Sequence, residues 1–443
     1  MEQKIVEKIK FLLKYMFIYI CFVFVFIIVL TVTSKIPTSA IQEKTTESAD
    51  ILLTEGNRKI SYIPYKDLNM QFDNYSDALM INTAYSIDPN SPLYSAMVAR
   101  KNYIPGVTQT IEQDSEKELK SASKYKYHNE VGELKDVTNN DITESFEYAR
   151  YWHGYLVVLR PLLTFANIRM IRIIFTVIFV ILACLLFYQL KKKINLFVAI
   201  IFLIGLIGVE YFYIGISIQS SFVFMITMIS SLIILIRGNK IKDVALIFFI
   251  VGILTNFLDL LTVPAISYGV PILVYFLTIQ KEKEFTLKEI IFVFFKYGIA
   301  WLAGYAITWI TKWILVDLLY NRNLIGIGLN QVLYRSVGGA KINYLSIVKE
   351  NIYYLKYFAV APILFSIIYL CANIISKRKN EKIYTILPYF IIALIPFMWY
   401  FIIRDHSYKH AFFTYRNLIL SIISVPIGFY YLFESEPKKE KIK

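Results

Sequence analysis

The chain is poor in the residues and motifs on which soluble enzymes depend. Its 443 residues include only three cysteines and four histidines, and 18% of them are charged. Each cysteine lies within an apolar run, so the sequence predicts no disulfide in the polar loops. The P-loop, dinucleotide-binding, zinc-protease and nucleophile-elbow motifs are also missing. These absences argue against a disulfide-rich secreted domain and against the common soluble enzymes that use nucleotides, zinc or an activated serine.

Long apolar runs fill most of the sequence instead. Hydrophobic residues make up 57% of the chain and aromatic residues 16%, which is too apolar for a soluble domain. About ten runs have the length and composition of helices that cross a bilayer core of about 30 Å. They lie at 11–33, 168–190, 195–213, 216–236, 243–258, 261–279, 290–316, 354–375, 384–403 and 412–433. The sequence therefore predicts an all-α polytopic membrane protein.

The lysines and arginines predict the orientation of this protein. The net charge is +14, and its clusters, such as Lys191–Lys193 and Lys281–Lys288, fall in alternate connections between the apolar runs. Because such clusters mark the cytoplasmic side, we expect a plasma-membrane protein with both termini in the cytoplasm. The basic excess then sets the topology and is no sign of a nucleic-acid partner.

This orientation divides the chain into four parts. They are an N-terminal transmembrane anchor (1–33), a large extracellular loop with interfacial helices (34–167), a multi-span core (168–433) and a basic cytoplasmic tail (434–443). The first run is longer than the apolar part of a signal peptide, and no small-x-small cleavage site follows it, which favours an uncleaved anchor.

The last outer segment gathers four basic candidates at one membrane boundary: Arg404, His406, His410 and Arg416. Charge at the junction of two spans predicts a functional site. The two histidines are spaced i, i+4 and share a helix face, and a helix N-terminus favours an anion. We expect these residues to bind a lipid phosphate. The alternatives are a metal site or histidines in a wet interfacial loop.

Two acids of the first loop are the candidate catalytic residues. Asp73 and Asp77 flank the start of a predicted helix that continues into Ala78–Ile81. Either carboxylate suits a general base, and Asp77 also suits a metal ligand. The alternative roles are a turn residue and a helix cap. We favour Asp77, with Asp73 second.

Four further polar residues are candidates for a supporting role. Arg150 and His153 lie in the segment 142–155, whose tyrosine and tryptophan content predicts an interfacial helix. Asp259 follows a short apolar run, so we expect it to lie below the membrane surface and to pair with an outer arginine such as Arg335 or Arg322. Three other arginines, Arg160, Arg169 and Arg172, are expected to extend their side chains toward the interface.

The architecture resembles the polytopic GT-C glycosyltransferases. The segments 148–155 and 406–416 are similar to stretches of multi-pass proteins of low-GC Gram-positive bacteria with the same arrangement. The resemblance implies a sugar donor linked to polyprenyl phosphate and an envelope glycan, lipid or protein as acceptor. It also implies an acid of the first outer loop, here Asp77 or Asp73, as base or as ligand of a divalent cation such as Mg²⁺ or Mn²⁺.

Two other functions remain open from the sequence. A transporter or flippase for lipid-linked or anionic envelope precursors, or a protein that handles their polymers, would use the same outer basic residues. It should also carry charges deeper in the membrane, where Lys296 and Lys312 are the candidates. A non-catalytic membrane scaffold would use the large loop to bind a partner.

Overall fold

The protein is built almost wholly from helices. The computed structural model describes residues 2–56, 59–60, 70–71, 73–103, 130–139, 144–337, 342–355 and 383–433, together with 364, 366–369 and 371–372. The predicted tail at 434–443 therefore lies outside the described residues, as does most of the run predicted at 354–375.

The elements before the multi-span core are α1 (Glu2–Ser34), α2 (Thr38–Glu55), β1 (Lys59–Ile60), β2 (Met70–Gln71), α3 (Asn74–Tyr85), α4 (Pro92–Val98), β3 (Arg100–Tyr103), α6 (Glu130–Asn139), β4 (Glu144–Glu147) and α7 (Leu156–Leu163). The elements that follow are α8 (Ile168–Lys193), α9 (Leu196–Gly208), η1 (Tyr211–Ile216), α10 (Ile218–Arg237), η2 (Gly238–Lys240), α11 (Val244–Leu258), α12 (Ile266–Ile279), α13 (Leu287–Tyr320), α14 (Leu324–Val337), α15 (Tyr344–Leu355), α17 (Ile383–Ile402), α18 (Arg404–Lys409), α19 (Ala411–Thr414), η3 (Tyr415–Leu418) and α20 (Ile419–Phe433).

Among the described residues, five helical segments are long and apolar enough to cross a membrane. They are Ile9–Ser34 of α1, all of α8, α10 and α13, and Ala411–Leu432, which joins α19, η3 and α20. The apolar helices α9, α11, α12 and Ile386–Ile402 of α17 are shorter. Several of the predicted spans are thus shorter than their apolar runs. The long apolar helices indicate a multi-pass membrane protein.

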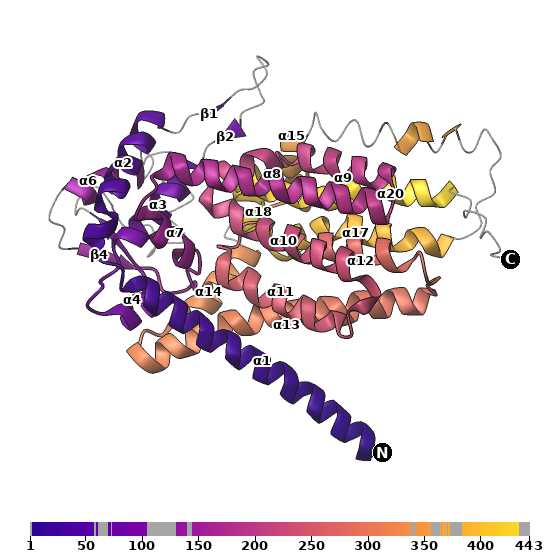
Figure 1. The fold of residues 1–443 in the computed structure, drawn as a ribbon, viewed down its shortest axis with the longest axis horizontal. Helices are drawn as coiled ribbons and strands as arrows, with labels where there is room; N and C mark the ends of the chain where they lie inside the picture. Colours follow the sequence, from indigo (N-terminus) through magenta and orange to yellow (C-terminus); the bar gives the residue numbers. More distant parts are fainter. Residues whose placement is uncertain are drawn as a thin grey trace.

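The long helices run side by side, and the elements of the first loop gather at one end of them (Figure 1). The start of α1 and the end of α20 point toward the opposite end (Figure 1). Helix α1 stands apart from the others over much of its length, and only 17% of the residues in its most apolar stretch are buried.

Glycines allow the closest contact within the bundle, between α11 and α13. A Cβ atom on Gly252 would lie 2.1 Å from the Trp301 carbonyl oxygen, and one on Gly304 would lie 2.2 Å from the Phe249 carbonyl oxygen. Either contact is too short for any side chain. Small residues that let two helix backbones touch are typical of helix packing in membranes, so this pair forms a fixed centre for the bundle.

Backbone contacts hold the end of the first loop against this centre. The Trp152 indole N–H donates to the Thr308 carbonyl at 2.7 Å, and the Gly154 N–H donates to the Phe257 carbonyl at 2.9 Å. Gly154 is required here, because an added Cβ would lie 2.4 Å from that same carbonyl oxygen. The loop is therefore joined to both α11 and α13.

Two buried cations complete this junction. The guanidinium of Arg160, fully buried in α7, donates to the carbonyls of Thr33, Ala84 and Ile36 at the ends of α1 and α3. Lys312 of α13 is also fully buried and donates to the Met97 carbonyl at 2.6 Å. Cations are favoured where helix carbonyls have no intrahelical partner. Arg160 is thus a structural residue, and its predicted reach toward the interface is wrong.

The predicted helix at 142–155 is also wrong. Residues 142–143 lie outside the described part, and Glu144–Glu147 form strand β4, which pairs antiparallel with β3. The chain then turns through His153, which has a positive φ of 55°, before α7 begins at Leu156. Pairing with β3 supplies the hydrogen bonds that a surface helix would have had to make internally.

Candidate functional site

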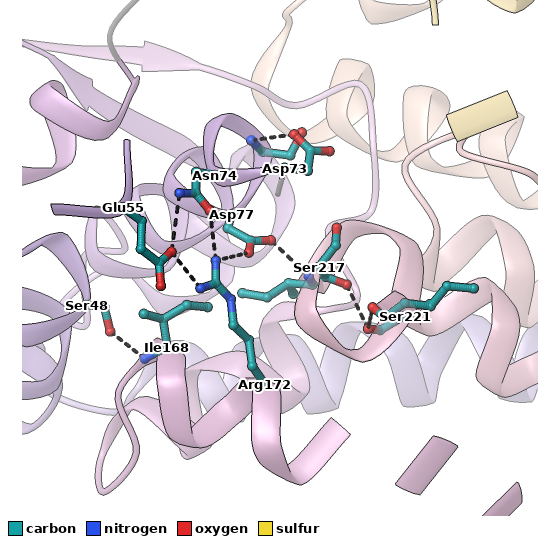
Figure 2. A network of polar contacts seen from close by, with 12 residues as sticks. Ser48, Glu55, Asp73, Asn74, Asp77, Ile168, Arg172, Ser217 and Ser221 are labelled. Carbon is teal, nitrogen blue, oxygen red and sulfur yellow. Dashed lines mark hydrogen bonds and ion pairs between the residues drawn. The ribbon is translucent and has the colours of Figure 1, made fainter. Parts of the chain in front are cut away.

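Asp77 lies at the centre of a buried polar network between the first loop and the core (Figure 2). Its side chain has no exposed surface. One carboxylate oxygen accepts from Arg172 Nη2 at 3.2 Å, and the other accepts from the backbone N–H of Ile218 at 2.8 Å. Ile218 is the first residue of α10, so the carboxylate also faces the positive end of that helix. Asp77 thereby joins α3, α8 and α10.

Arg172 has further partners in the same network. It donates to Glu55 at 2.8 Å and to Asn74 at 2.9 Å. The sequence-based expectation that Arg172 extends to the interface is therefore wrong, because the residue is 6% exposed and bound to the first loop. Burial raises the pKa of Asp77 to about 7, against the opposing attraction of Arg172. A carboxylate with both oxygens engaged is a poor candidate for a base or for a metal ligand.

Asp73 occupies a different environment on the same helix. It is the N-cap of α3, where one oxygen accepts from the Ser76 N–H at 3.2 Å. The capping role therefore belongs to Asp73, and Asp77 lies inside the first turn. The side chain is partly exposed. Burial raises its pKa, and the hydrogen bonds from Ser76 and, to a smaller extent, the charge of Arg416 act in the opposite direction.

Arg416 joins the last span to the turn between α9 and η1. Its guanidinium lies 3.9 Å from Glu210 and donates to the Val209 carbonyl at 3.3 Å. Both side chains of the pair remain partly accessible, at 14% for Arg416 and 15% for Glu210. Glu210 has a positive φ of 58°, and such strain in a residue other than glycine is common at functional sites. We call Asp73, Glu210 and Arg416 the acid–arginine cluster.

The residue after Arg416 is a second unusual feature of this region. Asn417 is fully buried, and neither polar atom of its amide has a hydrogen-bond partner among the described residues. Such a group is uncommon in folded proteins, because leaving it unpaired costs about 1–3 kcal/mol. The start of the last span therefore places a polar amide inside the bundle.

The other late basic residues form a separate group around Arg335. His406 Nδ1 lies 2.8 Å from Arg335 Nη1, and its Nε2 lies 2.8 Å from the Leu261 carbonyl oxygen. Since a guanidinium only donates and a carbonyl only accepts, Nδ1 is the acceptor and Nε2 carries the proton. Burial, together with the charge of Arg335, holds the pKa of His406 well below its usual value. The neutral ring therefore has no free donor for a phosphate.

His410 and Arg404 lie in the same group. The His410 ring is 4.6 Å from that of His406, which confirms their shared face, and it stacks on Phe413 at 5.2 Å. Burial lowers the pKa of His410 to about 4. Arg404 donates to the Ser336 carbonyl at 3.2 Å and lies over the ring of Tyr344. We call Arg335, Arg404, His406 and His410 the histidine–arginine cluster.

The remaining candidates have structural partners. Asp259 is 3% exposed, as expected, but its carboxylate accepts from the backbone N–H and hydroxyl of Thr262 rather than from an arginine. His153 is buried between the Tyr148 carbonyl and the Tyr155 hydroxyl. Arg150 lies over the ring of Tyr148.

Sequence reasoning missed Glu55 and Asn74 and misjudged Arg172. One signal was present: Arg172 lies one turn inside its span, as Arg416 does in the last span. The partners of such a residue are distant in sequence, and Arg172 is 95 residues from Asp77. The position alone therefore predicts a buried charge without saying what neutralises it.

Neither metal ligands nor known relatives assign a function. Within the described residues, no three His, Cys, Asp or Glu side chains gather where they could hold a metal ion. Comparison with protein-family models, curated proteins and solved structures gives no match to this chain.

Proposed function

We propose that this protein transfers a sugar from a polyprenyl-phosphate-linked donor to a cell-envelope acceptor at the outer face of the plasma membrane, as GT-C enzymes do. One observation supports it above the others: Arg416 of the last span lies beside Glu210, and its charge acts on Asp73 of the first loop. An acid and a guanidinium from opposite ends of the chain, both partly accessible, suit a transfer reaction at the membrane surface.

The chemistry assigns one task to each group. The acceptor hydroxyl bonds to the anomeric carbon and gives its proton to Asp73, while the bond from that carbon to the phosphate oxygen breaks. The electron pair leaves with the phosphate, whose growing charge Arg416 stabilises with donated hydrogen bonds. A lipid-linked donor cannot leave the membrane, so these groups must meet it there.

Asp73 replaces Asp77 as the proposed catalytic base. Both oxygens of Asp77 already accept hydrogen bonds in the Arg172 network, whereas Ser76 engages one oxygen of Asp73. If a divalent cation takes part, the Asp73 carboxylate is a better ligand than that of Asp77 for the same reason. Mg²⁺ and Mn²⁺ both prefer oxygen ligands.

The transporter alternative gains no support from the deep lysines. Lys312 donates to the Met97 carbonyl and lies over the Trp152 ring at 5.1 Å, so it anchors the first loop. Lys296 lies over the rings of Phe292 and Tyr297 on the same helix. Neither arrangement resembles a charge that a passing substrate would meet.

The test is a transfer assay with purified protein in liposomes. Polyprenyl-phosphate sugars carrying a radiolabel are offered together with an envelope extract, with and without EDTA. We expect label in the extract for the wild type and none for Asp73→Asn. The matched control is Asp50→Asn, because Asp50 is an exposed acid of α2 that pairs with Lys135. Transfer retained by Asp73→Asn, or no transfer by the folded wild type with any donor, would reject the proposal.

A further inference from the structure

Helix α14 turns an apolar face away from the protein. Ile325, Leu329 and Leu333 are 41%, 54% and 61% exposed, and their i, i+4 spacing places them on one face. The opposite face, with Leu324 and Gly328 buried, packs on the protein. A surface helix in water shows the reverse arrangement. The outward face of α14 therefore suits contact with lipid acyl chains.

The start of α14 is held close to the outer end of α13. The Asp317 carboxylate accepts from the backbone N–H of Leu324 at 2.5 Å and of Ile325 at 3.0 Å. A Cβ atom on Gly328 would lie 2.6 Å from the ring of Trp313, so this ring packs directly on the backbone of α14. This helix is a fixed element of the protein.

The other end of α14 is joined to α18 by three consecutive residues. Tyr334 accepts from Lys409 at 2.7 Å, Arg335 donates to His406 at 2.8 Å, and the Ser336 carbonyl accepts from Arg404 at 3.2 Å. The guanidinium of Arg335 is thereby placed at the protein-facing edge of a helix whose outer face is apolar.

Among the described residues, His406 is the one side chain that accepts a hydrogen bond from Arg335. A guanidinium has five N–H donors in a planar fork, and His406 takes one of them. Among the described residues, no carboxylate lies within ion-pair distance of Arg335. The nearby acids are committed elsewhere: Asp405 pairs with Lys409 at 3.1 Å, and Asp259 accepts from Thr262.

We propose that Arg335 binds the phosphate of an anionic lipid of the outer leaflet, that the lipid chains lie along the outward face of α14, and that His406 is the positioning residue. A neutral imidazole is suited to this role. It accepts one N–H of Arg335 and is itself held through the Leu261 carbonyl, so it orients the fork without adding a charge. This site is separate from the acid–arginine cluster and requires no sugar transfer.

The test is lipid retention by the purified full chain, measured by native mass spectrometry. Phosphatidic acid is compared with phosphatidylcholine that has the same acyl chains. We expect the wild type to prefer phosphatidic acid and Arg335→Gln to bind it at least about 10-fold more weakly, the effect of losing a charged hydrogen bond. The matched control is Arg322→Gln, since Arg322 already pairs with Glu147 at 2.8 Å. Equal retention by these two variants would overturn the site.

Two further arms test the lipid source and the role of His406. Inorganic phosphate, at the concentration of the lipid, should not displace phosphatidic acid. Full displacement would show that a free anion suffices and would refute the proposal that the ligand is a lipid. His406→Gln keeps an acceptor and a donor, so it should retain binding, whereas His406→Phe should lose it in a protein that elutes as a single folded species. Equal binding by both would remove His406 as a positioning residue.

Discussion

Replacing Asp77 by asparagine should reduce stability rather than abolish a reaction. The side chain is fully buried and its charge is matched by Arg172 at 3.2 Å. Removing one partner of a buried ion pair costs about 3–5 kcal/mol. Here the amide oxygen of the introduced side chain can still accept from Ile218, and Arg172 keeps its bond to Glu55 at 2.8 Å. We therefore expect a loss of about 2–3 kcal/mol in the free energy of unfolding for Asp77→Asn, which is below that range.

A double-mutant cycle with Arg172→Gln isolates the contribution of the pair. Arg172→Gln leaves Asp77 and Glu55 without their cation and should be the more damaging single change. The double variant should be less destabilised than the sum of the two singles, with a coupling free energy of about 1–2 kcal/mol. Unfolding in mixed detergent–SDS micelles, followed by tryptophan fluorescence, gives these values.

The control for the cycle is Asp50→Asn, whose acid is 56% exposed and should change stability by less than about 0.5 kcal/mol. Coupling of less than about 0.5 kcal/mol between positions 77 and 172 would refute the reasoning, because the ion pair would then make no measurable contribution to the free energy of unfolding. The same variants separate the two acids of α3: Asp77→Asn should keep transfer when folded, and Asp73→Asn should not.

Three further predictions follow from other contacts. Burial lowers the pKa of His153 to about 3, so the unfolded chain binds more protons than the folded one between pH 6.5 and 3. Lowering the pH from 6.5 to 4 should therefore reduce the free energy of unfolding by about 3 kcal/mol. His153→Gln should weaken this pH dependence, and an unchanged dependence would contradict the prediction. Lys312→Met should cost about 1–3 kcal/mol by leaving a buried carbonyl of α4 unpaired, and faster proteolysis of the first loop should accompany the loss. In a cysteine-free background of intact cells, cysteines at Asn90 and Asn321 should react with an impermeant thiol reagent and one at Lys283 should not; labelling of one outer position alone would break the shared outer face.

The sequence predicted the long helices well, because apolar length is a local property. The runs at 11–33, 168–190, 216–236 and 290–316 correspond to α1, α8, α10 and α13. The run at 195–213 was too long as predicted, since its apolar composition continues through the turn η1 after α9 has ended at Gly208. Apolarity alone does not mark where a buried helix ends.

The site was predicted less well, because its geometry depends on contacts between distant segments. The choice between Asp73 and Asp77 depended on where α3 begins, and a shift of one turn exchanges a cap for a buried residue. The sequence grouped Arg416 with His406 and His410, but the structure places it with Glu210 and Asp73. Nothing in the local pattern distinguishes these two arrangements.

The contacts of the basic residues divide them into two kinds. A cation at the end of a membrane span is costly unless other groups satisfy it. The side chains of Arg160, Arg172 and Lys312 meet this requirement inside the protein, through carbonyls or acids of α1 and the first loop. Among the described residues, Arg335 donates to one neutral imidazole, and Arg416 donates to the Val209 carbonyl and lies 3.9 Å from its acid. The first kind holds the loop to the bundle, and the second kind comprises the two residues that we propose as anion-binding groups.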